Sequence, residues 1–219
     1  MAKSYGRCMQ IIYKKSAAPY VARAAILLCL LISGTANAVD VKRHKQEGPD
    51  VISASTHVAA TPALLLAALE QPCHVIQWMP DLIDVRPLPD DAQPGQRIYM
   101  LTRGNLFASP RDAINRFIRH GQSPTIIEMR SEPDALPRQS GVIRIPFARA
   151  RWSIFAAEDT TLATYQQEVA AGGNVPQWLA DQYSLRHVTR ALESLTTYVA
   201  TLSTADCSHP VRPVRPGES

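Results

Sequence analysis

Residues 171–202 read AGGNVPQWLADQYSLRHVTRALESLTTYVATL. Apolar side chains recur in this stretch at spacings of three and four residues, at Leu185, Val188, Leu192, Leu195, Val199 and Leu202. This spacing places them in one stripe along an amphipathic helix. Pro176 suits the first helical turn, and Asn174 just upstream suits the cap. The stretch therefore predicts a long C-terminal helix that lies on a partner.

The chain upstream of this helix has the alternation that is typical of β-strands. We predict strands over residues 50–59, 82–88, 96–102, 111–120, 125–131, 141–155 and 161–170, with a bend at Pro146. Two short helices, residues 61–69 and 73–79, follow the first strand and are separated by Pro72. The sequence thus predicts an α+β fold in which one antiparallel sheet packs against the long helix.

Four motifs resemble segments of bacterial START-domain proteins, which belong to the helix-grip (SRPBCC) superfamily. They are GGNVPQWLA at residues 172–180, QWMPD at 77–81, SPRDA at 109–113, and RIP at 144–146 followed by RWSI at 151–154. They stand in the family's order, whereas residues 104–108 lack the aromatic-proline pair of many relatives. The resemblance implies a curved antiparallel sheet wrapped around a long C-terminal helix, with short helices after the first strand. It also implies a hydrophobic cavity between sheet and helix that takes a lipid or another apolar molecule.

Residues 1–38 have the features of a secretory signal peptide. Their only charges are five Lys and Arg side chains, and an apolar run over residues 24–32 leads to small residues at Ala36 and Ala38. The run is shorter than the roughly 20 residues that span a bilayer as a helix; an uncleaved anchor is the alternative. We expect an exported protein, periplasmic in a Gram-negative source or else secreted. Residues 39–49 are expected to be a flexible arm, residues 50–204 the START-like domain, and residues 205–219 a disordered Pro-rich tail.

Removal of residues 1–38 changes the net charge. The full chain has 23 Lys and Arg against 19 Asp and Glu, and the exported part keeps 18 basic against 19 acidic residues, a net charge of −1. A nucleic-acid partner therefore has no electrostatic support. The expected partner is a lipid or small hydrophobic ligand. We expect a monomer, and a transient contact with a membrane is compatible with this role.

Two cysteines remain after this removal, Cys73 and Cys207, and an even pair in an oxidising compartment is a candidate disulfide. The resemblance favours the pairing, because it places the short helices beneath the end of the long helix; two unpaired thiols are the alternative. The histidines lack metal-ligand spacing, so we expect no metal and no cofactor. Asp112, Glu128 and Glu168 are interpreted as solvated strand charges, and no catalytic residue is assigned.

Arg116 is the main candidate for contact with the polar group of a ligand. It shares one side of its strand with Ile114, and it points inward if that side matches the apolar side of Ile127 and Met129. A guanidinium on an apolar face needs a partner, which a lipid headgroup would supply. An internal salt bridge and a register shifted by one residue are the alternatives.

The other candidate lining residues are apolar or aromatic. They are Ile114, Ile127, Met129, Ile145, Trp152, Tyr165 and Trp178, the last near the cavity mouth. The predicted function is binding of a lipid or similar ligand, of which a carrier role is one form. The alternatives are a cyclase- or hydratase-type enzyme and a closed-core envelope interaction protein. A buried carboxylate or histidine in the cavity would favour the enzyme, and a filled interior would favour the interaction protein.

Overall fold

A computed structural model describes residues 39–89, 91–104, 109–158 and 160–207. The predicted signal peptide lies outside the described residues, as do residues 105–108 and residues 208–219 of the predicted tail. Among the described residues, no helix combines the length and the apolar character that crossing a bilayer requires.

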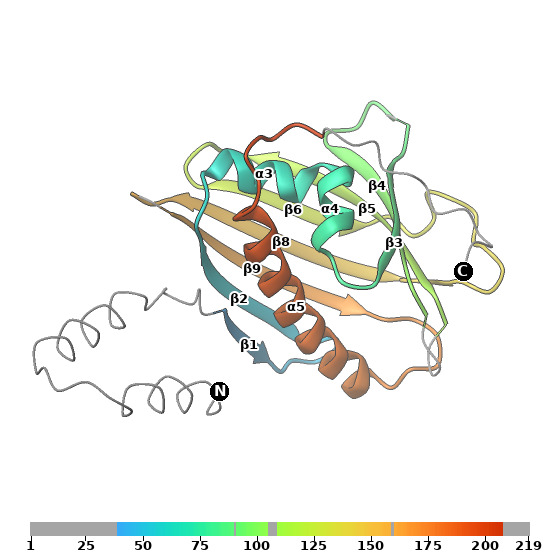
Figure 1. The fold of residues 1–219 in the computed structure, drawn as a ribbon. Coiled ribbons are helices and arrows are strands. Elements are labelled where there is room, and N and C mark those ends of the chain that lie inside the picture. The colour runs from blue at the N-terminus through green and yellow to red at the C-terminus, as the bar shows by residue number, and fades with distance from the viewer. Residues whose placement is uncertain (1–38, 90, 105–108, 159, 208–219) are drawn as a thin grey trace, which may run out of the picture. The chain divides into compact units, whose positions relative to one another are not determined.

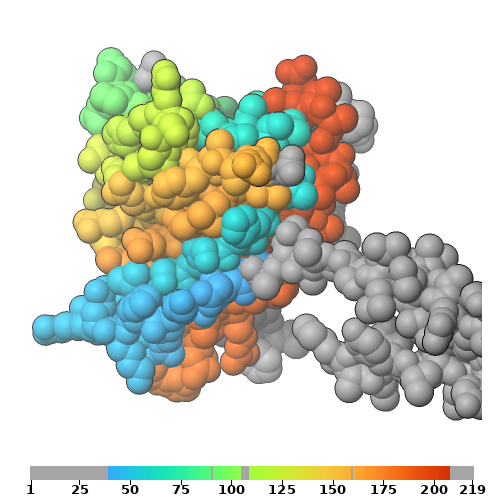
Figure 2. All heavy atoms as spheres, turned by 90° about the vertical axis from the view of Figure 1, so that its left-hand side faces the viewer, coloured from blue at the N-terminus to red at the C-terminus, as the bar shows by residue number. Residues whose placement is uncertain are grey.

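The described chain forms one nine-stranded sheet and three helices. In chain order the elements are β1 (Asp40–His44), β2 (Val51–Val58), α3 (Pro62–Glu70), α4 (Pro72–Trp78), β3 (Leu82–Pro87), β4 (Gln96–Thr102), β5 (Arg111–His120), β6 (Thr125–Ser131), β7 (Ile143–Arg144), β8 (Phe147–Ala156), β9 (Thr161–Ala170) and α5 (Gln177–Val199). The strand order is β1-β2-β9-β8-β6-β5-β4-β3, and β7 pairs with β5. Figure 2 shows this order from the side, from β1 in blue through β8 and β9 in orange to β5 in green.

Helix α5 crosses one face of the sheet, and α3 and α4 cover the same face near the C-terminal end of α5 (Figure 1). Leu192, Leu195 and Val199 of α5 are buried in one cluster with Leu65 of α3 and Ile154 of β8. The three α5 residues belong to the apolar stripe that predicts the helix. The predicted antiparallel α+β fold class, with its long C-terminal helix and short helices after the first strands, is confirmed.

The interpretation of residues 39–49 as a flexible arm is wrong for its first half, because β1 is an edge strand paired antiparallel with β2. Val39 and Val41 pack on the core cluster, whereas Lys42 and His44 point outward and are exposed. Arg43 points inward, where it pairs with Asp50 and lies 3.8 Å from the Asp181 carboxylate of α5. Basic residues stand on both sides of β1, so polar and apolar residues do not alternate clearly in the sequence. The run therefore has the composition of a solvated linker.

The turn from β9 into α5 depends on two glycines. Gly172 and Gly173 have φ angles of +70° and +66°, in the left-handed region that side chains rarely adopt. A Cβ on Gly173 would lie 2.9 Å from Cδ1 of Ile143, so the turn also packs closely on β7. The predicted cap, Asn174, is not used: α5 begins at Gln177 after Pro176, with no side-chain cap.

The predicted strand 141–155 is divided into β7 and β8 by Pro146, as the bend there anticipates. The short β7 runs parallel to β5, which brings Arg144 beside Asp112. The two side chains form a buried bidentate ion pair, with N–O distances of 2.8 and 2.9 Å. Asp112 is therefore not a solvated strand charge, as the sequence suggested, but the anchor of the segment that leads into β8.

A disulfide joins Cys73 of α4 to Cys207, beyond the end of α5. The closed loop spans 134 residues, and by the chain-entropy estimate such a loop stabilises a fold by about 4–5 kcal/mol. The neighbouring His74 contacts Tyr198 Oη at 2.7 Å and Ala205 O at 3.2 Å. Cys73, His74 and Cys207 are close enough to resemble a metal site, but their sulfurs are bonded to each other and both imidazole nitrogens have partners.

Candidate ligand-binding cavity

A cavity of about 430 Å³ lies between the sheet and the N-terminal half of α5, with α4 at one side. Small side chains on both walls leave this space empty. They are Ala113 of β5 and Ala148 and Ala150 of β8 on the sheet, and Ala180, Ser184 and Ala191 on α5. The C-terminal half of α5 carries leucines in contact with the core instead, so the interior is filled there. The interaction-protein alternative requires an interior that is filled throughout. The cavity shows that the interior is not filled beneath the N-terminal half of α5.

The walls of the cavity are mainly apolar. Val85, Ile98, Met100 and Phe117 contribute from β3, β4 and β5, and Trp78 and Met79 from the end of α4. Trp152 of β8 and Tyr165 of β9 lie side by side, with ring centroids 4.3 Å apart. Such a surface suits the hydrocarbon part of a ligand.

The polar groups inside the cavity are few. The Tyr165 hydroxyl donates to Gln167 Oε1 at 2.8 Å, and burial raises the pKa of this tyrosine, so the hydroxyl stays protonated. Asn115 is 4% exposed, and its side chain makes one hydrogen bond with the described residues, from Nδ2 to the sulfur of Met100 at 3.6 Å. Burial lowers the pKa of His187, whose ring stacks with Tyr183, so the imidazole is neutral at pH 7. Asn115 Oδ1 and His187 Nδ1 have no hydrogen-bond partner among the described residues.

The polar end of the cavity lies where β4 ends and β5 begins. Arg103 and Arg111 line it there, together with Ala171 and Val175 of the segment before α5. Arg111 donates to Ala171 O at 3.2 Å and to Ser109 O at 3.1 Å, and no carboxylate of the described residues pairs with it. Leu179 and Tyr183 line the cavity from α5 and are also exposed, so the cavity reaches the surface beside them.

The predicted lining residues divide into two groups. Met129, Ile145, Trp152 and Tyr165 line the cavity, and their contact with a ligand stays a prediction. Ile127 is buried in the core cluster beside Trp152 and does not line the cavity. Trp178 is 61% exposed and lies outside the lining, next to Leu179 at the start of α5.

The prediction that Ile114 and Arg116 point toward the cavity is wrong. In the β5–β6 pair Met129 lies opposite Phe117, so the cavity side of β5 carries Ala113, Asn115 and Phe117. Ile114 and Arg116 point to the opposite face. The strand pairing is shifted by one residue from the predicted register, which is the alternative named in the sequence analysis. The sequence did not distinguish the two registers, because the two sides of β5 are nearly equal in apolar character.

Arg116 is instead the centre of an ion-pair cluster on the outer face. It is 1% exposed and donates to Glu132 Oε1 at 2.5 Å and to Asp91 Oδ2 at 2.5 Å. The two carboxylates raise the pKa of Arg116, and its hydrogen bonds in turn lower the pKa of Asp91. The internal salt bridge weighed as an alternative is therefore the one that forms.

Arg111 and Asn115 are two of the polar lining residues that sequence reasoning missed. Both lie on the same strand as Arg116, at odd-numbered positions. The correct register of β5 would have identified them as cavity-facing residues. That register is known only from the pairing of β5 with β6 in the structure.

Comparisons with known proteins support the fold. No protein-family model matches the sequence. An uncharacterised Pseudomonas aeruginosa protein is 30% identical over 71 residues, which are 32% of this chain and 35% of that relative.

Solved structures match over most of the chain. A STAR-related lipid transfer protein of Xanthomonas axonopodis superposes with a TM-score of 0.68 at 24% identity, covering 77% of this chain and 97% of that one. The human StarD13 lipid transfer and protein localization domain gives 0.65 at 11% identity, covering 86% and 100%. Human STARD10 gives 0.62 at 15% identity, covering 85% and 81%. The START resemblance predicted from the four motifs is thereby confirmed at the level of the fold.

Proposed function

We propose that this protein, a chain with the START-like helix-grip fold, binds a lipid or similar hydrophobic ligand and carries it between membranes or proteins. The observation that carries the proposal is the apolar cavity of about 430 Å³ beneath α5. Its size falls in the range of about 300–1,000 Å³ that is typical of small-molecule sites. Each buried methylene contributes about 0.8 kcal/mol, so a chain of ten gives roughly 8 kcal/mol before the costs of association.

The proposed setting is outside the cytoplasm. The predicted signal peptide supports it, and a disulfide such as Cys73–Cys207 persists in oxidising compartments. An exported carrier would meet lipids in the cell envelope.

The test is to express the full chain, recover the exported protein gently and record its native mass spectrum. We expect a polypeptide that begins at Val39, with one lipid-sized adduct that organic extraction releases. The polypeptide mass reports on export and the adduct on binding, so the two parts are judged separately. A protein that carries no adduct, and takes none up from a panel of lipids, would overturn the binding proposal.

A membrane contact at the start of α5 belongs to the same proposal. Trp178, Leu179 and Tyr183 are exposed large side chains on two adjacent helical turns, beside the place where the cavity reaches the surface. Tryptophan and tyrosine rings are favoured at membrane–water interfaces. This end of α5 would therefore face the bilayer while a lipid moves in or out.

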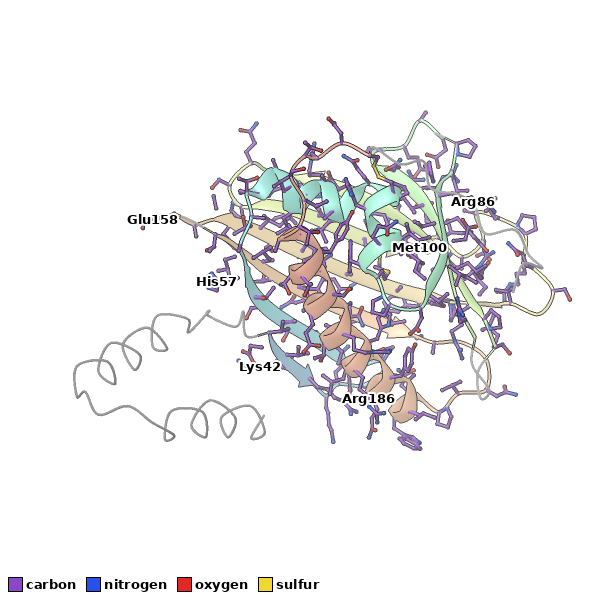
Figure 3. The ribbon with its side chains drawn as sticks, viewed as in Figure 1. Lys42, His57, Arg86, Met100, Glu158 and Arg186 are labelled. Carbon is purple, nitrogen blue, oxygen red and sulfur yellow. A yellow bond between two sulfur atoms is a disulfide. The ribbon has the colours of Figure 1, made fainter. Side chains whose placement is uncertain are left out.

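The variant Trp178→Ser is expected to slow lipid transfer between vesicles about tenfold while leaving the amount of lipid bound unchanged. Burial of the ring in the membrane interface stabilises the docked state by about 1.5–3 kcal/mol, and the variant loses this stabilisation while the lipid-binding cavity is unchanged. Phe155→Ser is the matched control, because Phe155 is also exposed but lies on β8 close to Glu158, far from Arg186 of α5 in Figure 3. Equal transfer rates for both variants and the unaltered protein would exclude this docking surface.

An enzyme of cyclase or hydratase type is the second candidate, and the observation in its favour is His187. This histidine is a half-buried lining residue whose Nδ1 is buried, and it is neutral, so it is able to accept a proton. The charged lining residues of the described chain are the two arginines. The Asp81 carboxylate acts on the charge of His187, but it accepts hydrogen bonds from Tyr183 and Arg190 and, among the described residues, none from the imidazole. Turnover of a bound ligand to a product, lost in His187→Phe, would favour this candidate over a carrier.

A further inference from the structure

Asn115 lies in an apolar part of the cavity with an unmet hydrogen-bonding need. Its neighbours in the lining are Ile98 on the paired strand β4, Ala113 and Phe117. Within the described parts of the chain, its Nδ2 reaches only the thioether of Met100, a weak acceptor, and its Oδ1 has no partner. A buried carbonyl without a partner costs about 1–3 kcal/mol, and such groups are rare in folded proteins.

The other amide in the lining is in a different situation. Gln167 accepts from the Tyr165 hydroxyl, so the two groups satisfy each other. The residue opposite Asn115 on β6 is Ser131, whose Oγ accepts a hydrogen bond from the Ala148 N–H at 2.9 Å. Neither Ser131 nor any other described residue donates to Asn115 Oδ1. The unpaired Oδ1 is therefore left for a group that enters the cavity.

We propose that the ligand carries a hydroxyl group that donates a hydrogen bond to Asn115 Oδ1. This inference rests on the proposed binding function and names the class of ligand: an apolar molecule with a neutral alcohol. A hydroxyl has the donor that Oδ1 needs and an acceptor for Nδ2, whereas esters, ketones and plain hydrocarbon have no donor. An ammonium group would need a carboxylate, and no described Asp or Glu lines the cavity.

The position of Asn115 also constrains the ligand. Arg111 lies four residues away on the same side of β5, which is about 13 Å along an extended strand. The hydroxyl therefore sits well inside the cavity, away from the arginine end. Two kinds of molecule fit: a long-chain alcohol that enters hydroxyl first, and an acyl chain with a hydroxyl part-way along it.

The test measures displacement of a fluorescent fatty acid from the delipidated exported protein by two matched pairs: hexadecanol against hexadecane, and hydroxystearate against stearate. We expect at least one hydroxylated member to bind about tenfold more tightly than its partner, the factor that corresponds to about 1.4 kcal/mol. A preference within the first pair alone identifies the alcohol that enters hydroxyl first. A preference within the second identifies the hydroxylated chain.

The variant Asn115→Leu is expected to abolish the preference while keeping affinity for the unhydroxylated member. Ile118→Leu, on the opposite face of the same strand, is the control that should keep the preference. If Asn115→Leu does not fold, Asn115→Ala makes the same test without added bulk. Asn115 would be excluded if its variants keep the preference, which would then belong to another group such as His187 Nδ1.

Failure of the inference is distinguishable from failure of the proposed function. Equal affinity of the unaltered protein for both members of each pair overturns the hydroxyl inference and leaves lipid binding intact. Binding of none of the four probes, with no lipid retained on purification, overturns the binding function itself.

Discussion

Replacement of Ala150 by phenylalanine is expected to weaken lipid binding about a hundredfold and to leave the protein folded. Ala150 is buried on β8, between Met129 and Gln167 on the two flanking strands, and its methyl group faces the cavity. A benzyl group at this position projects into the space that a hydrocarbon chain would fill. Exclusion of about four methylenes removes roughly 3 kcal/mol, which lowers the affinity about a hundredfold.

The cost of this change to stability should be small, because the ring enters an existing cavity and not a close-packed core, where overpacking costs about 1–3 kcal/mol. Ser153→Phe is the control, since Ser153 lies on the same strand and on the opposite face. Native mass spectrometry gives the lipid content of both variants and thermal unfolding gives their stability. Retention of a full complement of lipid by a folded Ala150→Phe protein would show that the ligand does not occupy this cavity.

Replacement of Arg116 by leucine is expected to lower the free energy of unfolding by about 2–3 kcal/mol and to leave lipid binding unchanged. Removal of one partner of a buried ion pair costs about 3–5 kcal/mol, because the other charge is left unpaired. Here Asp91 and Glu132 retain partial access to water, with side chains 25% and 21% exposed, so the lower part of that range or less applies. Urea denaturation measures the effect.

Arg151→Leu supplies the matched comparison on the same outer face. Arg151 pairs with Glu128, but both side chains are about half exposed, and such surface pairs contribute less than about 1 kcal/mol. We therefore expect a clear difference between the two arginine variants in stability and none in lipid content. Loss of lipid from a stable Arg116→Leu protein would contradict the placement of this side chain on the outer face.

Much of the fold was accessible from the sequence, because its strongest signals are periodic. The stripe from Leu185 to Leu202 predicts α5, since residues three and four apart must lie on one side of a helix. Pro62 and Pro72 mark the starts of the short helices, and Pro146 marks the bend between β7 and β8. The proline ring restricts φ at these positions whatever the tertiary contacts are. Four motifs in the order of a known family add the topology.

The sequence was less informative where polar and apolar residues alternate without contrast. The run that contains Lys42 and His44 has the composition of a linker, and it becomes β1 only because the edge of β2 and the side of α5 offer a place to pack. Asp181 stands on the polar side of the helical pattern but is buried, since it accepts a hydrogen bond from the backbone N–H of Asp50. The second case depends on a residue 131 positions away, and the first depends on α5 as well as on the nearby β2.

The sequence by itself determined the fold class, most of the elements and the chemical nature of the interior, because these follow from local propensity and periodicity. Tertiary structure alone decided which side of β5 faces the cavity, so that Asn115 and Arg111 line it and Arg116 does not. The reason is physical: a shift of one residue in strand pairing exchanges the two sides at little local cost. The cavity is likewise a tertiary property, since alanines on β8 and α5 create an empty space only when they face each other.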